Sequence, residues 1–253
     1  MDGVNAVNGN VTAGELRGRA WRALSRGNDF LRFFLGLFTL NVLLTLGVLA
    51  AAAVFVGGAA GMSVLAQSMG ADPEKDIFLL SLANLVPASV LVLGVLYAVG
   101  YLTWGQTAMG VATMRGGLSF SHAFSGWGNG WRTVSLLLWQ STFVTLWALL
   151  FIVPGIRAAF SYALAPYLLV DHPDWTPRQC IAESKRLMEG HRWRFFCLNF
   201  SFFGWYILVA AVNAFVPFVG GLAGYAVQAY VQTGTAAFYE DMLDREDARK
   251  ARA

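Results

Sequence analysis

Charged residues are scarce in this sequence. Asp, Glu, Lys and Arg make up 13% of the 253 residues, about half of their usual share in soluble proteins, while hydrophobic residues make up 57%. A soluble domain of this composition would expose large apolar patches and aggregate, whereas lipid tails would cover the same surface in a bilayer. The composition therefore excludes an ordinary soluble domain and indicates an integral membrane protein. The net charge of +3 does not indicate a partner nucleic acid.

Cysteine and histidine are rare as well. The cysteines, Cys180 and Cys197, have no histidine at ligand spacing, so they predict neither a disulfide framework nor a zinc site. The glycine-rich segment 126–130 lacks the Lys of a phosphate-binding loop. The first apolar run begins only at Phe33, which is too far along the chain for a secretory leader. No cofactor, metal or catalytic pair is expected from these residues.

Long apolar runs dominate the rest of the chain. Between Arg132 and Arg157, twenty-four consecutive positions carry no formal charge, and at about 1.5 Å per residue such a helix crosses a bilayer. Pro154 and Gly155 then end that helix. Six membrane-spanning helices are expected, over residues 33–56, 77–102, 134–153, 154–170, 195–215 and 219–239. The fourth is the shortest and contains Arg157 and Pro166, so whether it fully spans stays open.

The predicted fold class is all-α, a polytopic membrane helix bundle of about six transmembrane helices with additional cytoplasmic amphipathic helices. The segments are a disordered N-terminus (1–11), a cytoplasmic amphipathic helix (12–32), a six-span membrane domain (33–239) with a cytoplasmic helix (176–190), and a charged cytoplasmic tail (240–253). Each amphipathic helix begins with a recognisable cap.

Two local patterns support the amphipathic helices. Thr12 and Glu15 have the spacing of a capping box, and the following turns place arginines opposite apolar side chains. This helix lies either on the inner membrane surface or against the protein's own cytoplasmic face. In the second helix, Thr176 is the expected N-cap, Pro177 occupies the first helical position and Gly190 follows the end.

The placement of basic residues predicts the orientation. With the N-terminus inside and six spans, all Lys and Arg residues except Lys75 and Arg157 lie on the inner side. Such a bias orients inner-membrane proteins. We therefore expect a multi-pass protein of the bacterial cytoplasmic membrane with both termini in the cytoplasm.

The second half of the chain carries a series of motifs in a characteristic order. They are Leu146–Ile156 with its Pro154-Gly155 pair, Tyr162–Ala165, Asp171–Pro173, Ser184–His191, Ser201–Trp205 and Ala237–Glu240. With these motifs the chain resembles the bacterial integral-membrane family catalogued as domain of unknown function 975, from about Glu15 to Asp241. It departs from the family's usual pattern at the turn before residue 219, where it has Pro217-Phe218. The resemblance implies an inner-membrane protein of six or so helices and no established activity.

Uncharged polar residues within the expected spans are the candidate contacts. Asn84, Gln140 and Gln228 either hold helices together through interhelical hydrogen bonds or line a pathway. Arg157, directly after the Pro-Gly break, either reaches the outer headgroups or binds an anionic lipid or substrate. These four residues are the possible lipid or substrate contacts.

Three functional classes follow from these features. The first is a non-enzymatic membrane-organising or accessory component that contacts membrane lipids and either other proteins or further copies of itself. The second is a transporter or permease-like protein for a small or lipidic substrate, which requires a hydrated cavity lined by the polar residues. The third is a membrane enzyme, which requires His172 and His191 to meet in a cytoplasmic cleft.

Overall fold

The structure is a computed structural model that describes residues 11–68, 70 and 77–251. All of the regular structure in these residues is helical, which confirms the all-α fold class. The elements in chain order are α1 (Ala13–Leu24), α2 (Asp29–Ser68), α3 (Ile77–Met114), the 3-10 helix η1 (Phe120–Phe124), α4 (Gly130–Leu150), α5 (Ile152–Ser161), α6 (Ala165–Asp171), α7 (Pro177–Leu187), α8 (Arg192–Phe215) and α9 (Pro217–Lys250). The expected disordered segment 1–11 lies outside the described residues except for Val11.

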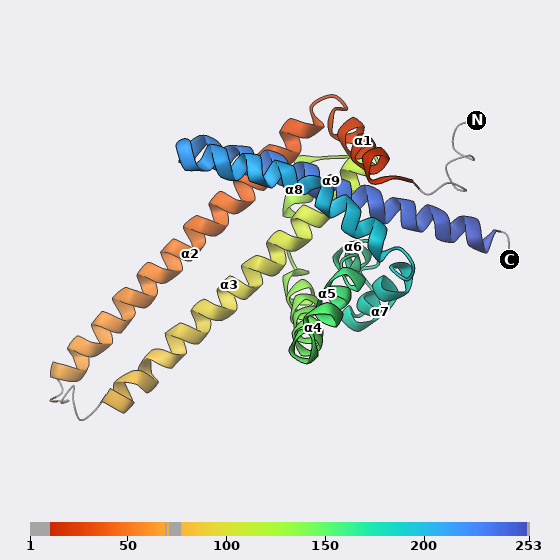
Figure 1. Ribbon diagram of the computed structural model, residues 1–253. Coiled ribbons are helices and arrows are strands. Elements are labelled where there is room, and N and C mark those ends of the chain that lie inside the picture. The colour runs from red at the N-terminus through yellow and green to blue at the C-terminus, as the bar shows by residue number, and fades with distance from the viewer. Residues whose placement is uncertain (1–10, 69, 71–76, 252–253) are drawn as a thin grey trace.

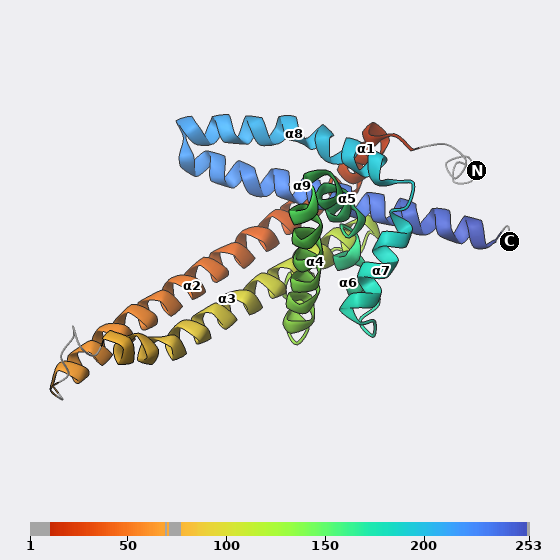
Figure 2. The same ribbon diagram turned by 60° about the horizontal axis from the view of Figure 1, so that its bottom comes forward.

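Three helical hairpins project from one packed centre (Figure 1). We call the hairpins the arms: α2 with α3, α4 with α5, and α8 with α9. We call the centre the hub: α1, α6 and α7 together with the parts of α3, α8 and α9 that pack around them. Figure 2 shows that the arms leave the hub in different directions, with the α2–α3 arm the longest.

The two helices of the α2–α3 arm are longer than a bilayer is thick. α2 has 40 residues and α3 has 38, so each is nearly 60 Å long, against a bilayer hydrocarbon core of about 30 Å. The start of α2 and the end of α3 are buried at the centre of the molecule, where Phe33, Leu37 and Met109 are inaccessible. Only the remainder of each helix projects freely.

Large apolar side chains on the arms face outward. Val54 on α2, Leu149 on α4 and Phe215 on α8 are 76%, 79% and 87% exposed. In the hub, by contrast, Leu168, Phe238 and Tyr239 are almost fully buried. This distribution is typical of helices whose outer surface meets lipid, and it supports a membrane protein.

Five described segments are long and apolar enough to cross a membrane: Asp29–Gly58, Ala88–Met114, Gly130–Leu150, Ile152–Asp171 and Arg192–Phe215. The sixth expected span, 219–239, is helical as part of α9 but is not among the five. Its glycines, Gln228 and Gln232 lower its hydropathy. The fourth, Ile152–Asp171, is interrupted between α5 and α6, and much of α6 is buried in the hub.

The first amphipathic helix is shorter than expected. Its capping box is present, with the Thr12 N–H donating to Glu15 Oε2 at 2.7 Å, but α1 ends at Leu24 and not at residue 32. Gly27, with φ of +53°, lets the chain turn into α2. The apolar face of α1, including buried Leu16, packs against α8 and α9. The apolar face of α1 therefore lies against the protein itself, while Trp21 and Arg22 are exposed on its other side.

Candidate functional site

The hub contains a four-residue ion cluster where α3, α6 and α9 meet. The Arg115 guanidinium donates to both Asp171 carboxylate oxygens, at 2.9 and 2.6 Å, and to Glu240 Oε1 at 2.8 Å. The Tyr239 hydroxyl donates to Asp171 Oδ2 at 2.9 Å. Burial raises the pKa of Glu240 above its ordinary value, and the charge of Arg115 opposes that rise. One arginine thus ties three helices together.

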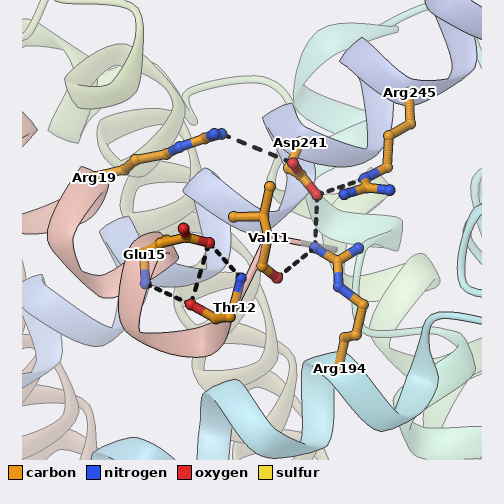
Figure 3. A network of polar contacts seen from close by, with 7 residues as sticks. All are labelled: Val11, Thr12, Glu15, Arg19, Arg194, Asp241 and Arg245. Carbon is orange, nitrogen blue, oxygen red and sulfur yellow. Dashed lines mark hydrogen bonds and ion pairs between the residues drawn. The ribbon is translucent and has the colours of Figure 1, made fainter. Parts of the chain in front are cut away.

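A second cluster joins α1, α8 and α9 (Figure 3). Asp241 is only 5% exposed and accepts hydrogen bonds from Arg194 Nη2 and Arg245 Nε, both at 2.9 Å. Arg19 Nη1 lies 3.8 Å from the other oxygen of the same carboxylate. Arg194 Nη2 also donates to the Val11 carbonyl at 3.0 Å. Because three guanidinium groups face one carboxylate, the cluster has an excess of positive charge.

The excess charge acts on the neighbouring histidine. Burial lowers the pKa of His191 below its ordinary value, and Arg194 and Arg245 lower it further. A neutral imidazole is therefore favoured at this position. His191 lines a cavity of about 340 Å³ with Arg186, Arg245 and others.

The break between α5 and α6 is held by Ser184 on α7. Its hydroxyl donates to the Ser161 carbonyl at 2.9 Å and accepts from the Leu164 N–H at 3.2 Å. Arg192 Nε donates to the Ser161 hydroxyl at 2.8 Å. These bonds satisfy backbone groups that the interrupted helix leaves unpaired. The interruption is thus a specific feature of the fold, maintained by a distant side chain.

A third polar group, the glutamine cluster, lies outside the ionic clusters. Gln106 Oε1 on α3 accepts from Gln228 Nε2 at 3.2 Å and from Gln232 Nε2 at 3.4 Å, both on α9. Gln232 Oε1 accepts from the Tyr167 hydroxyl of α6 at 3.0 Å. The cluster therefore connects the same three helices as the Arg115 cluster, by neutral hydrogen bonds.

The four residues proposed as contacts lie in different settings. Gln228 belongs to the glutamine cluster. Gln140 lies on α4, and its Oε1 is buried without a hydrogen-bond partner among the described residues. Arg157 lies on the surface of α5. Asn84 lies in α3, but its side chain is outside the described part of the structure. Gln228 pairs with Gln106, which was not in the proposed set, and no hydrogen bond joins the described side chains of Gln228, Gln140 and Arg157 to one another.

The histidines have separate environments. The His172 ring stacks on Trp175 with centroids 4.1 Å apart, whereas His191 precedes α8. Within the described residues, no group of three or more His, Cys, Asp or Glu side chains could hold a metal ion.

Several residues that form the polar clusters of the hub have no distinguishing local pattern in the sequence: Arg115, Arg194, Asp241 and Gln106. Their partners gave a partial signal, since Asp171 and Tyr239-Glu240 belong to the motifs quoted above. Arg115 and Arg194 were interpreted only as inner-side charges that orient the chain. The pairing of Arg115 with Asp171, fifty-six positions away, has no local pattern that would reveal it.

Comparison with known proteins identifies the family of this chain. Residues 77–246 match the family described as protein of unknown function (DUF975). No curated protein and no solved structure matches the chain. The match covers more than half of the sequence and includes the motifs from Leu146 to Glu240, so the resemblance expected from those motifs is confirmed. The chain therefore belongs to the DUF975 family.

Proposed function

We propose that this protein is a non-enzymatic, membrane-organising accessory component of the bacterial cytoplasmic membrane, with the hub and both termini on the cytoplasmic side. The observation that carries the proposal is the divergence of three apolar arms from one ionic hub (Figures 1 and 2). The arms expose their apolar residues, and the hub holds the charged clusters, in which Asp241 is buried and Arg115 is half exposed.

The divergence of the arms supports a role in shaping the bilayer. Transmembrane helices tilt from the bilayer normal by about 0–40°. Arms that leave a common hub in different directions occupy more area at their tips than at the hub. The two leaflets are then displaced unequally, which favours curvature or local disorder of the lipids.

The hub supports the cytoplasmic placement. α1 and the C-terminal end of α9 lie on the side of the hub away from the tips of the α2–α3 and α8–α9 arms (Figure 1). Arg22, Arg249 and Lys250 lie near these ends and are exposed. Basic side chains at this level are attracted to the anionic inner leaflet.

Reconstitution tests the proposal. The full chain is inserted into vesicles at increasing protein-to-lipid ratios, and vesicle diameter is measured by electron cryomicroscopy. We expect smaller or tubular vesicles as the ratio rises. Asp171→Asn, which weakens the hub junction at Arg115, should reduce the effect, while Asp174→Asn, at an exposed position in the loop before α7, should not. Unchanged vesicles despite complete insertion of the protein would overturn the proposal.

The glutamine cluster favours a second function, transport of a small or lipidic substrate. Neutral polar groups between membrane helices can line a pathway, and Gln228 borders a cavity of about 400 Å³. A solute-flux measurement on the same vesicles tests it. Flux that falls in Gln228→Leu would support transport, and vesicles no leakier than protein-free ones to a panel of small solutes would exclude it for those solutes.

A further inference from the structure

The cavity beside the glutamine cluster is lined by glycine, tyrosine and glutamine residues together with one valine. It is about 400 Å³ in volume and is bounded by Tyr206 of α8 and by one face of α9. On α9, the residues Gly221, Gly224, Gln228 and Gln232 line it at intervals of three or four positions, so they form one stripe along the helix.

Two glycines keep the cavity open. A Cβ atom added at Gly221 would meet no other atom within 4 Å, and one added at Gly224 would meet only Val209 Cγ1 at 3.8 Å. The space is therefore not required for close approach of neighbouring helices. A side chain larger than glycine at either position would project into it.

Gln228 presents an unused acceptor to this space. Its Nε2 donates to Gln106 Oε1 at 3.2 Å, while its Oε1 has no hydrogen-bond partner among the described residues. None of the lining residues is charged. An unpaired carbonyl oxygen within a bilayer is stabilised by a hydrogen-bond donor. The complementary ligand group is therefore a neutral donor such as a hydroxyl.

The mouth of the cavity opens to the outer surface of the α8–α9 arm. Tyr206 is 49% exposed and Gly221 is exposed, and α8 is one of the segments apolar enough to cross a membrane. A ligand that enters here comes from the lipid phase and carries apolar chains.

We propose that this cavity binds a neutral, hydroxyl-bearing glycerolipid of the diacylglycerol class. Its hydroxyl donates to Gln228 Oε1, and its acyl chains leave past Tyr206 and Gly221 along the arm. The inference rests on the proposed function in one respect, the insertion of the α8–α9 arm into the bilayer.

Photo-crosslinking tests the proposal. The full chain is reconstituted into phosphatidylcholine vesicles that contain a photoactivatable diacylglycerol or, in parallel, a photoactivatable phosphatidylcholine, which has no hydroxyl group. Labelled peptides are identified by mass spectrometry. We expect the diacylglycerol probe to label peptides spanning residues 206–232, and the phosphatidylcholine probe to label them at least about fivefold less, as expected for the loss of one hydrogen bond.

Three variants sharpen the test. Gly224→Leu fills the cavity with a side chain and should lower diacylglycerol labelling about tenfold, because a ligand that still entered would be overpacked against the leucine. Gln228→Met removes the acceptor and should lower labelling about fivefold. Gly204→Leu is the matched control, because Gly204 is exposed on α8 with open space around its Cβ position. It should label as the unmodified chain does.

Two results would overturn the inference: equal labelling by the two probes, or full labelling of Gly224→Leu. If Gly224→Leu fails to fold, Gly221→Leu fills the same cavity and replaces it. Flotation of each variant with the vesicles reports insertion separately. A chain that does not float contradicts the proposed function as well, whereas a chain that floats and stays unlabelled contradicts this inference alone.

Discussion

The hub and the arms are stabilised in different ways. In the hub, buried Asp241 has arginine partners from three directions, and Phe238 and Tyr239 are fully enclosed. On the arms, large apolar side chains such as Leu149 point away from the protein. The hub is therefore specified by contacts within the chain, whereas the arms depend on helical hydrogen bonds and on surrounding lipid. Substitutions in the two regions should differ in effect accordingly.

The largest effect is expected at Asp241. Asp241→Ala leaves the Arg194 and Arg245 guanidinium groups without their shared carboxylate, and removal of one partner from a buried ion pair costs about 3–5 kcal/mol. Thermal unfolding in detergent measures the loss. Asp244→Ala, three positions along α9 and exposed, is the control and should change stability by less than about 0.5 kcal/mol. Equal stability of the two variants would show that the second ionic cluster does not hold the hub together.

Ser184→Ala should have the next largest effect. It removes the donor to the Ser161 carbonyl and the acceptor for the Leu164 N–H, and a buried unsatisfied backbone group costs about 1–3 kcal/mol. Hydrogen exchange at residues 161–165 should accelerate. Ser121→Ala, on an exposed segment of η1, should leave exchange there unchanged. Slow exchange in Ser184→Ala would mean that the α5–α6 break is held by packing alone.

A pair of glycine substitutions should change stability in opposite directions. A Cβ atom at Gly155 would lie 2.7 Å from Ala148 Cα, so Gly155→Ala forces α4 and α5 apart and should destabilise by about 1–3 kcal/mol. At Gly47, within α2, nothing lies within 4 Å of the Cβ position. Gly47→Ala should therefore stabilise the helix by about 0.5–1 kcal/mol. Thermal unfolding measures the stability change of each variant. A change in the same direction for both would contradict the distinction between a glycine packed against a neighbouring helix and one on an open arm surface.

The smallest effect on stability concerns Cys180, which is useful as a reporter of the hub. Burial raises the pKa of its thiol from 9.0 to about 11. Burial of the neutral thiol is favourable, and the folded protein has the higher pKa. The stability that the buried thiol contributes is therefore fully present below about pH 9 and is lost as the pH rises through 11. Maleimide labelling at pH 7 should be slow in the intact protein and faster in Asp241→Ala. Rapid labelling of the unmodified chain would show that the hub is more open than the structure indicates.

Local patterns were sufficient for part of the fold. The cap at Thr12, Pro177 at the first position of α7 and the turn at Gly190 each depend on neighbours within a few residues, and all three are found as expected. The apolar arms follow from uninterrupted hydrophobic runs. By contrast, the break after Ser161 depends on Ser184, twenty-three positions away. No local pattern encodes such a contact.

The candidate site was less accessible to prediction for the same reason. Gln228 was identified because a polar residue in an apolar segment is conspicuous, but its partner Gln106 was not. The ionic clusters consist of residue types that also serve as inner-side charges, so Arg115 and Arg194 had a sufficient explanation from their position alone. Pairing across three helices becomes visible only when the hub is assembled.

The α9 helix runs without a break from Pro217 in the arm to Lys250 beyond the hub. In its C-terminal half this helix is tied to the hub, since Glu240 pairs with Arg115 and Asp241 pairs with Arg194 of α8. One unbroken helix therefore joins the turn at the tip of the α8–α9 arm to the exposed basic residues at the far end, and the ionic clusters anchor it between the two.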